Sequence, residues 1–275
     1  MISSMESNVL LSKFNTSIDE APTQDTLLDL FQQQVERDPN LVALIYENRE
    51  IKYEELDVLS NQFAHYLQKH HNISKNTLVG INLDRSDWMV IVILGILKSG
   101  AGYVPLDPGY PKERLQYIEE DSKYELCVDE QDLKSFKVSK ADYPKSELAI
   151  NIEVSDLSYI IYTSGTTGYP KGVMVDHGNI SNHISSMSSC YDVTSSDRFI
   201  LFSNITFDAS LEQLFLPLIN GSTLHIVSRE LLLNVDDFID YIDHNGITHL
   251  HATPGFLNTL PYRELKSLKR IISAG

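Results

Sequence analysis

Hydrophobic residues recur along this chain at two spacings, and the two spacings alternate. Some segments place apolar residues every three or four positions, as in the run Leu27, Leu28, Phe31 and Val35. Between such segments lie short, continuous apolar runs, which are typical of buried strands. Helical and extended patterns that alternate in this way predict a parallel α/β fold.

The two patterns assign a position to each expected element. Helices are expected at about 27–37, 56–67, 86–98, 111–121, 179–187, 208–218 and 235–244. Strands are expected at about 42–46, 51–53, 78–81, 103–106, 126–128, 159–162, 199–202, 223–227, 247–251 and 268–272. Thr26 is a suitable N-cap for the first helix, and Asp38-Pro39 ends it. The helix at 86–98 is apolar on nearly every side, so we expect it to be buried.

A polar stretch rich in lysine, serine and aspartate divides the chain. It runs from Glu130 to Glu153 with little periodicity, which is typical of a surface connection. We therefore expect lobes at about 25–130 and 153–275, joined by a connector at 131–152. Residues 1–24 are expected to be an N-terminal extension.

Composition narrows the class of protein. The chain carries 22 Lys and Arg against 38 Asp and Glu, a formal net charge of −16, which disfavours a general nucleic-acid binder. Its two cysteines lie outside any CxxC spacing and indicate neither a disulfide framework nor a zinc site. No apolar run reaches the roughly 20 residues that span a bilayer, and the N-terminus lacks the pattern of a signal peptide. These features predict a cytoplasmic protein with no nucleic-acid or membrane partner.

One loop carries a dense set of groups that can bind phosphate. After the strand at 159–162 the chain reads Thr163-Ser164-Gly165-Thr166-Thr167-Gly168-Tyr169-Pro170-Lys171-Gly172. Glycines permit φ > 0 and a close approach of the backbone, so that amide N–H groups can converge on an anion. Hydroxyls and a lysine add further donors. The residues expected to hold a triphosphate are Thr163, Ser164, Gly165, Thr166, Thr167, Gly168 and Lys171.

Other kinds of loop fit this segment less well. Tyr169 and Pro170 separate Gly168 from Lys171, so the loop is not a Walker A loop, and it does not read GxGxxG. A flexible surface turn is an alternative that composition alone would permit. The apolar strand directly before the loop favours a phosphate site.

The loop resembles the phosphate-binding signature of the adenylate-forming enzyme superfamily, which includes acyl-CoA ligases, luciferases and the adenylation domains of nonribosomal peptide synthetases. Residues 51–56, IKYEEL, are similar to the first core motif of the peptide-synthetase branch, and residues 97–107, LKSGAGYVPLD, are similar to the second. The resemblance runs from about Asp25 to Gly275. It implies an α/β fold of stacked, mostly parallel β-sheets flanked by helices. This fold is that of the N-terminal subdomain of an adenylation domain, here incomplete, with the C-terminal subdomain absent.

The sequence Phe207-Asp208-Ala209-Ser210 is similar to the fourth core motif of the same branch. The resemblance implies that Phe207 shapes the entrance to the carboxylate site and that Asp208 binds the α-ammonium of the substrate. On its own, a carboxylate at the start of a helix would be a good N-cap. The resemblance also implies a substrate pocket formed by Phe207, Asp208, Ala209, Glu212, His251, Ile272 and Ala274.

Two features of this expected pocket admit more than one interpretation. Glu212 lies one helical turn after Asp208, so both can face one cavity. A second acid there would favour a polar or cationic substrate side chain, and a solvated glutamate is an equal alternative. His249 and His251 alternate on an expected strand and could bind a metal from one face. Without a third ligand in the sequence, we expect core or pocket histidines and no metal site.

The resemblance implies the ATP- and Mg²⁺-dependent activation of an amino acid as an aminoacyl-adenylate. A phosphopantetheine group on a peptidyl carrier protein would then accept the amino acid, with other synthetase domains as partners. The family's later motifs do not occur in this sequence, so we expect no complete catalytic set and no activity from these residues alone. Two alternatives are an acyl- or aryl-CoA ligase, and a non-catalytic lobe that binds nucleotide or docks on a partner.

Overall fold

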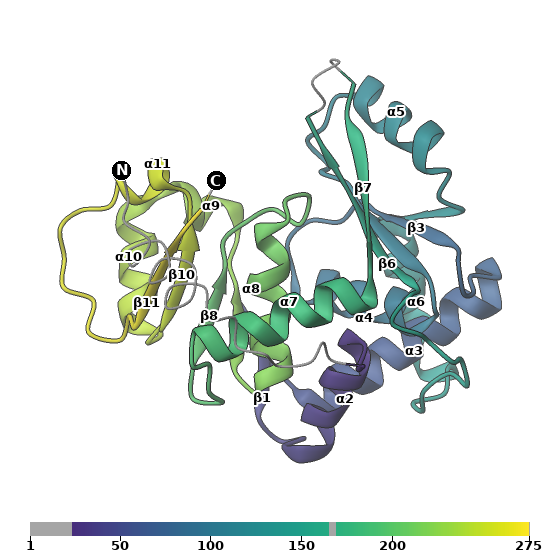
Figure 1. Ribbon diagram of the computed structural model, residues 1–275, viewed down its shortest axis with the longest axis horizontal. Helices are drawn as coiled ribbons and strands as arrows, with labels where there is room; N and C mark the ends of the chain where they lie inside the picture. Colours follow the sequence, from purple (N-terminus) through teal and green to yellow (C-terminus); the bar gives the residue numbers. More distant parts are fainter. Residues whose placement is uncertain (1–23, 165–168, 275) are drawn as a thin grey trace, which may run out of the picture.

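The computed structural model describes residues 24–164 and 169–274, which form two β-sheets with helices between and around them (Figure 1). Within these residues the first sheet has six strands in the order β11–β10–β8–β9–β1–β2. They are β1 (Val42–Tyr46), β2 (Arg49–Lys52), β8 (Arg198–Leu201), β9 (Thr223–Ile226), β10 (His249–Ala252) and β11 (Arg270–Ser273). The strand pairs are parallel except β1 with β2, which form a hairpin at one edge.

The second sheet, in the same described residues, has five strands in the order β5–β3–β4–β6–β7. They are β3 (Leu78–Ile81), β4 (Gly102–Pro105), β5 (Leu126–Val128), β6 (Leu157–Thr163) and β7 (Lys171–Asp176). Only β6 and β7 pair in antiparallel fashion. Their hairpin extends beyond the rest of the sheet, beside helix α5 (Figure 1).

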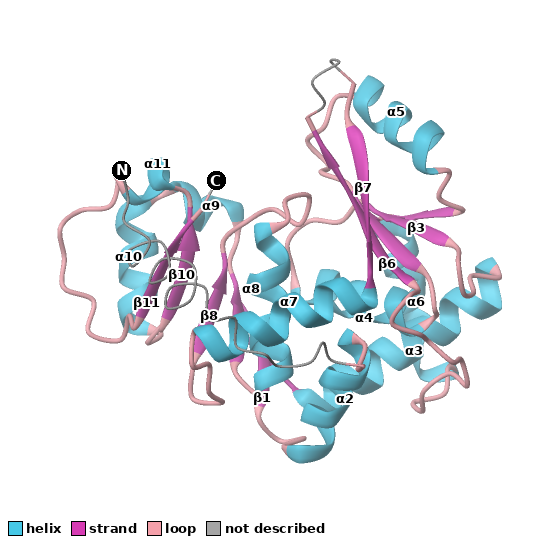
Figure 2. Ribbon diagram, viewed as in Figure 1, coloured by secondary structure: helices cyan, strands magenta, loops and turns pink. Residues whose placement is uncertain are grey.

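Helices fill the space between the sheets and cover their outer faces (Figure 2). They are α2 (Leu27–Arg37), α3 (Tyr53–His71), α4 (Asp87–Lys98), α5 (Lys112–Ser122), α6 (Glu130–Ser139), α7 (His177–Cys190), α8 (Ala209–Asn220), α9 (Arg229–Leu233), α10 (Val235–His244) and α11 (Pro254–Leu257). Helix α8 packs on β8 and β9, helix α7 packs on β6 and β7, and the two helices contact each other. The predicted α/β fold of mostly parallel sheets flanked by helices is confirmed.

Helix α4 is buried along nearly its whole length, as its uniformly apolar sequence predicts. The Ser86 side chain accepts a hydrogen bond from the Met89 N–H at 3.3 Å and caps the first turn. The helix packs on β3 and β4 of one sheet and on β1 of the other. Because both sheets cover it, it presents almost no polar face.

The two sheets do not follow the expected division of the chain at 131–152. The hairpin β1–β2 comes early in the chain yet pairs with β9, and the hairpin β6–β7 comes after the expected connector yet pairs with β4. That connector itself includes most of α6 and the short 3₁₀ helix η1 (Lys140–Asp142). Asp129 caps α6 with a capping box, and Leu133 and Phe136 are buried beneath it. Strand and helix alternation predicts the fold class, but it does not say which sheet each strand joins.

A partly buried arginine joins the two sheets. Arg85, in the loop after β3, donates hydrogen bonds to main-chain carbonyls at the ends of β8 and β9, among them Ser203 O at 2.9 Å and Val227 O at 3.0 Å. Burial lowers the pKa of Arg85 to about 10. These bonds hold the ends of strands from both sheets at one side of the molecule, where the candidate site also lies.

Candidate active site

A cavity of about 380 Å³ lies between α7 and α8 and is closed by residues of β6, β7 and β10. In the described chain its wall is formed by Tyr159, Val175, Asn179, Ile180, His183, Asp208, Ala209, Leu211, Glu212, His251 and Ala274. Apolar side chains alternate with two carboxylates and two imidazoles. A small polar molecule with an apolar portion fits such a wall.

The structure brings five of the expected pocket residues together on this wall: Asp208, Ala209, Glu212, His251 and Ala274. Ile272 lines a smaller void of about 10 Å³ that also touches Glu212 and His251. Phe207 lines neither space, and its side chain is 62% exposed. The expected residues that form the pocket therefore come from α8 and its N-cap, from β10 and from the position after β11. Phe207 lies outside the pocket.

The loop before α8 presents Asp208 at the edge of the cavity. Asp208 is the N-cap of α8, and its Oδ1 accepts a hydrogen bond from the Ala209 N–H at 2.8 Å. Asn204 fixes the loop, because its Oδ1 accepts from the Thr206 N–H at 3.0 Å and its Nδ2 donates to Asp107 Oδ2 at 2.7 Å. Asp107 ends the second core motif, so Asn204 ties that motif to the loop that carries Asp208. The sequence analysis missed Asn204, whose only signal is a side chain suited to an Asx turn.

Gln213 holds the cavity wall from behind. Its side chain is buried, and its Oε1 accepts hydrogen bonds from the N–H groups of Phe202 and Ser203, both at 2.8 Å. Its Nε2 donates to the main-chain oxygen of His251 at 3.3 Å. One amide thus fixes the ends of β8 and β10 against α8. The sequence analysis missed Gln213 too, although an uncharged polar residue inside an otherwise apolar helix face is a signal for such a role.

Glu212 lies between two histidines. His183 Nε2 lies 2.8 Å from Glu212 Oε1, and His251 Nδ1 lies 3.6 Å from Glu212 Oε2. The hydrogen bond to Glu212 raises the pKa of His183, whereas burial lowers the pKa of His251. His183 was not expected from the sequence, because α7 reaches the cavity only through the fold.

The expected phosphate loop joins β6 to β7 at the end of their hairpin. Gly165, Thr166, Thr167 and Gly168 lie outside the described residues. Thr163 pairs with Lys171 in the hairpin register, and Thr163, Ser164 and Lys171 are all exposed. Four residues of strand at about 3.3 Å each place Thr163 roughly 13 Å from Tyr159 in the cavity wall. The same β6–β7 hairpin therefore carries both sets of residues. The described ends of the loop lie toward its tip, and the cavity residues Tyr159 and Val175 lie toward its base.

Two contacts explain the shape of this hairpin. Tyr169 stacks on Tyr117 of α5 with ring centroids 5.5 Å apart, and the Tyr117 hydroxyl donates to Pro170 O at 3.1 Å. At Gly172 a Cβ atom would lie 2.9 Å from Ile160 Cγ2 and 3.1 Å from Tyr162 Cζ. Glycine is therefore required at this position because side chains of β6 cross over it.

Comparison with known proteins agrees with this geometry. Residues 31–275 match the family described as AMP-binding enzymes. The chain belongs to this family. The resemblance to adenylate-forming enzymes is thereby confirmed.

The similar AMP-binding enzymes include peptide synthases that are much longer than this chain. Gramicidin S synthase 1 from Brevibacillus brevis is 36% identical over 98% of this chain and 26% of its own length. Bacitracin synthase 3 from Bacillus licheniformis is 35% identical over 98% of this chain and 4% of its own length. The chain thus spans about a quarter or less of these two relatives.

Solved AMP-binding enzymes share the fold. The N-terminal subdomain of NpsA from Klebsiella oxytoca, in complex with 3-hydroxybenzoyl-AMSN, superposes with a TM-score of 0.78 at 23% identity, over 89% of this chain and 64% of that one. A nonribosomal peptide synthetase in its α-methyl-L-serine-AMP bound form gives a TM-score of 0.82 at 23% identity, over 90% of this chain and 30% of that one. The expected fold of the N-terminal subdomain is therefore confirmed.

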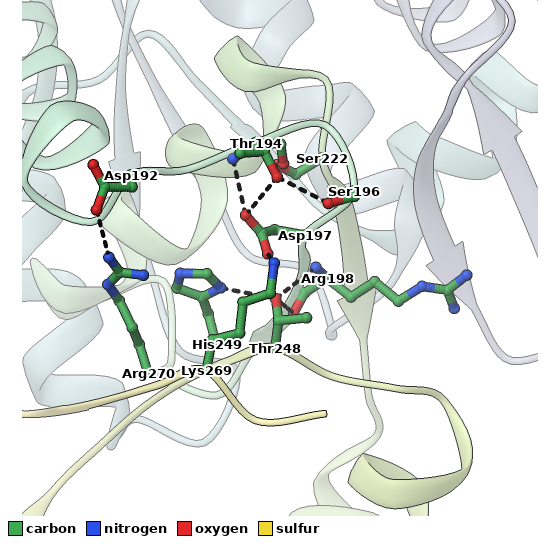
Figure 3. A network of polar contacts seen from close by, with 10 residues as sticks. All are labelled: Asp192, Thr194, Ser196, Asp197, Arg198, Ser222, Thr248, His249, Lys269 and Arg270. Carbon is green, nitrogen blue, oxygen red and sulfur yellow. Dashed lines mark hydrogen bonds and ion pairs between the residues drawn. The ribbon is translucent and has the colours of Figure 1, made fainter. Parts of the chain in front are cut away.

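In this AMP-binding enzyme a polar network holds the edge strand β11, which is followed by the cavity residue Ala274 (Figure 3). Asp197 is buried and accepts hydrogen bonds from Lys269 Nζ at 2.6 Å and from the Thr194 N–H at 2.8 Å. Burial alone would raise the pKa of Asp197, but these donors hold it below its ordinary value. Arg270 Nη2 donates to Asp192 Oδ2 at 3.1 Å. The loop after α7 thereby fixes the position of Ile272 and Ala274.

The described part of this AMP-binding enzyme forms neither a metal-binding cluster nor a helix that could span a membrane. Residues 24–164 and 169–274 contain no group of three His, Cys, Asp or Glu side chains arranged to hold a metal ion. His249 stacks on Phe199 with ring centroids 4.3 Å apart, and only His251 of the two strand histidines lines the cavity. A search of the same residues finds no helix with the length and apolar character needed to cross a membrane.

Proposed function

We propose that the protein containing this chain activates an α-amino acid as its aminoacyl-adenylate, and that residues 25–275 supply the N-terminal part of the adenylation domain. One observation carries this proposal most directly. Asp208, the acid of the fourth core motif, borders a cavity of amino-acid size that also receives Ala209, Glu212, His251 and Ala274. A carboxylate there is a suitable partner for the α-ammonium of a bound amino acid.

In the proposed first step, an oxygen of the substrate carboxylate attacks the α-phosphorus of ATP. A new O–P bond forms, the bond from phosphorus to the bridging oxygen breaks, and pyrophosphate leaves. Because both reactants are anionic, donors must offset their charge. Pairing of the α-ammonium with Asp208 would hold the substrate carboxylate in one orientation.

The donors proposed to bind the phosphates come from the β6–β7 hairpin. The described ends of the loop present the hydroxyls of Thr163 and Ser164 and the ammonium of Lys171, a donor set that fits phosphate. We propose that Gly165, Thr166, Thr167 and Gly168 add backbone and hydroxyl donors between them. Mg²⁺ bound with the nucleotide would neutralise phosphate charge, and we assign no residue of this chain to it.

We propose that the second step transfers the amino acid to a carrier. The thiol of a phosphopantetheine group on a peptidyl carrier protein attacks the acyl carbon, a thioester forms and AMP leaves. The similarity to multidomain synthases such as gramicidin S synthase 1 supports a partner of this kind and other synthetase domains. We place this reaction in the cytoplasm.

Exchange of labelled pyrophosphate into ATP tests the proposal in the full-length protein. We expect exchange to depend on an α-amino acid and to be absent with aryl acids and fatty acids. Exchange with an aryl or fatty acid alone would instead support an acyl-CoA ligase. Binding of ATP without exchange for any acid would support a non-catalytic lobe.

A further inference from the structure

We propose that the Glu212 side of the cavity recognises a second amine, so that the substrate is an amino acid with a cationic side chain, and that His183 competes with this amine for Glu212. This inference rests on the proposed function, and it adds the class of the substrate side chain. It depends on the juxtaposition of Asp208, Glu212, His183 and His251 around one space.

The spacing of the two carboxylates suits a diamino acid. Asp208 and Glu212 lie four residues apart at the start of α8, which places their Cβ atoms about 5–6 Å apart on one helix face. The two amines of a basic amino acid are separated by roughly four to six bonds of about 1.5 Å each. With its α-ammonium at Asp208, such a substrate can therefore reach Glu212 with its side chain.

The charges around Glu212 favour a cation over an anion or an apolar group. The titratable groups that face it are Asp208 on α8, His183 on α7, His251 on β10 and Tyr191 after α7. Together with Glu212 these groups comprise two carboxylates, two imidazoles and one phenol. Of the two imidazoles, only that of His183 has a pKa raised above the ordinary value for a histidine. The cavity wall thus joins two carboxylates with two imidazoles, only one of which is favoured in its protonated form, and this balance favours a cationic side chain.

A buried and unsatisfied imidazole marks the same wall. His251 is 8% exposed, and its Nε2 has no hydrogen-bond partner among the described residues. Glu212 Oε2 likewise pairs with no donor within hydrogen-bond distance in residues 24–164 and 169–274. Buried polar atoms are almost always paired in folded proteins. An apolar substrate side chain brings no donor to Glu212 Oε2, whereas an ammonium can donate to this oxygen.

His183 is the group that can compete with the substrate for Glu212. Its Nε2 contacts Glu212 Oε1 at 2.8 Å, and its side chain is 48% exposed at the cavity. When it is protonated it satisfies part of the Glu212 charge, and when it loses the proton that charge becomes available to the substrate. Preference for a cationic side chain should consequently rise as the pH rises through the pKa of His183.

The first experiment compares lysine, ornithine, norleucine and glutamate in pyrophosphate exchange by the full-length protein. We expect kcat/KM for lysine or ornithine to exceed that for norleucine, and Glu212→Gln to reduce this ratio by about 10- to 100-fold. Glu264→Gln removes an exposed acid away from the cavity and should leave the ratio unchanged. A preference for norleucine or glutamate in the unmodified protein would overturn the inference while leaving the proposed function intact. No exchange with any amino acid would overturn both.

The second experiment measures the ratio of kcat/KM for ornithine to that for norleucine between pH 6 and pH 8. The side-chain ammonium of ornithine stays protonated throughout this range, and the rates are corrected for the protonated fraction of each α-amine, so the ratio reports on the cavity. We expect it to rise with pH in the unmodified protein and to become flat in His183→Ala, with an increase at the acidic end. His244→Ala, at an exposed histidine of α10, serves as the control. A slope that survives in His183→Ala would show that His183 does not compete with the substrate for Glu212.

Discussion

At the scale of single residues, Tyr53 shows how a core motif contributes to folding as well as to chemistry. The Tyr53 side chain is fully buried, and its hydroxyl lies 2.9 Å from Pro217 O and 2.8 Å from Ser222 O. The first core motif therefore holds the C-terminal end of α8, whose N-terminal end carries Asp208. The motif acts on the site through the helix.

Tyr53→Phe should destabilise the protein without removing a group from the cavity. One hydroxyl proton is lost and a buried carbonyl is left without a donor, which costs about 1–2 kcal/mol. The free energy of unfolding in urea measures this loss. Tyr262→Phe, at a fully exposed tyrosine, is the matched control and should change stability by less than about 0.5 kcal/mol. Equal effects of the two substitutions would contradict the role of Tyr53.

The sequence predicts some residues of the cavity and not others for a physical reason. Asp208 and Glu212 are four positions apart on one helix, and helical geometry alone can place them on one face. His183 reaches Glu212 from another helix, and Gln213 acts on β8 and β10, so both depend on packing between distant segments. Residues whose roles depend on long-range contacts leave no periodic signal in the chain.

At the scale of elements, close packing of α3 on α4 sets the distance between the helices of the core. A Cβ atom at Gly95 of α4 would lie 2.7 Å from Phe63 Cδ1 and 3.0 Å from the main-chain oxygen of Ser60, both in α3. One of these contacts is with backbone, so it cannot be relieved by a rotamer change. Glycine at this position lets the two helices touch.

Gly95→Ala is expected to destabilise the fold by about 1–3 kcal/mol through overpacking. The gain of about 1 kcal/mol in helix propensity offsets only part of that cost. Gly255→Ala in α11, where a Cβ would meet nothing within 4 Å, should be neutral or slightly stabilising. Urea midpoints compare the two, and a neutral Gly95→Ala would mean that α3 and α4 can separate without loss.

The elements that could not be predicted from the sequence are those without a hydrophobic pattern of their own. Strand β7 exposes Gly172, Val173 and Met174 and shows no alternation, so only its pairing with β6 makes it a strand. The pairing of β1 with β9 joins segments nearly 180 positions apart, which no local pattern could indicate. By contrast, α4 and α10 have strong periodic or apolar patterns, and their positions were predicted to within one residue.

At the scale of the whole molecule, a net charge of −16 and buried histidines give opposite responses to acid. Protonation of surface carboxylates relieves repulsion between like charges. His177 and His225 are both almost fully buried, and burial lowers the pKa of each to about 4. Unfolded, these histidines would titrate near pH 6.5, so the unfolded chain binds more protons between these values.

Stability should therefore fall as the pH falls from about 6.5 towards 4, by as much as about 3 kcal/mol for each of these histidines. The contribution is fully present above pH 6.5 and is lost on acidification. His225→Phe should make the dependence of the urea midpoint on pH shallower in this window, whereas substitution of the exposed His244 should not. An unchanged slope in His225→Phe would mean that His225 is not held neutral by the fold.

The central claim is that Asp208 pairs with the α-ammonium of the substrate, and the most direct test compares an amino acid with its deamino analogue. In pyrophosphate exchange by the full-length protein, we expect the unmodified enzyme to prefer the amino acid by at least about 100-fold, since only the amino acid has an ammonium to pair with Asp208. Asp208→Asn should remove most of that preference. Retention of the full preference in Asp208→Asn would contradict the account.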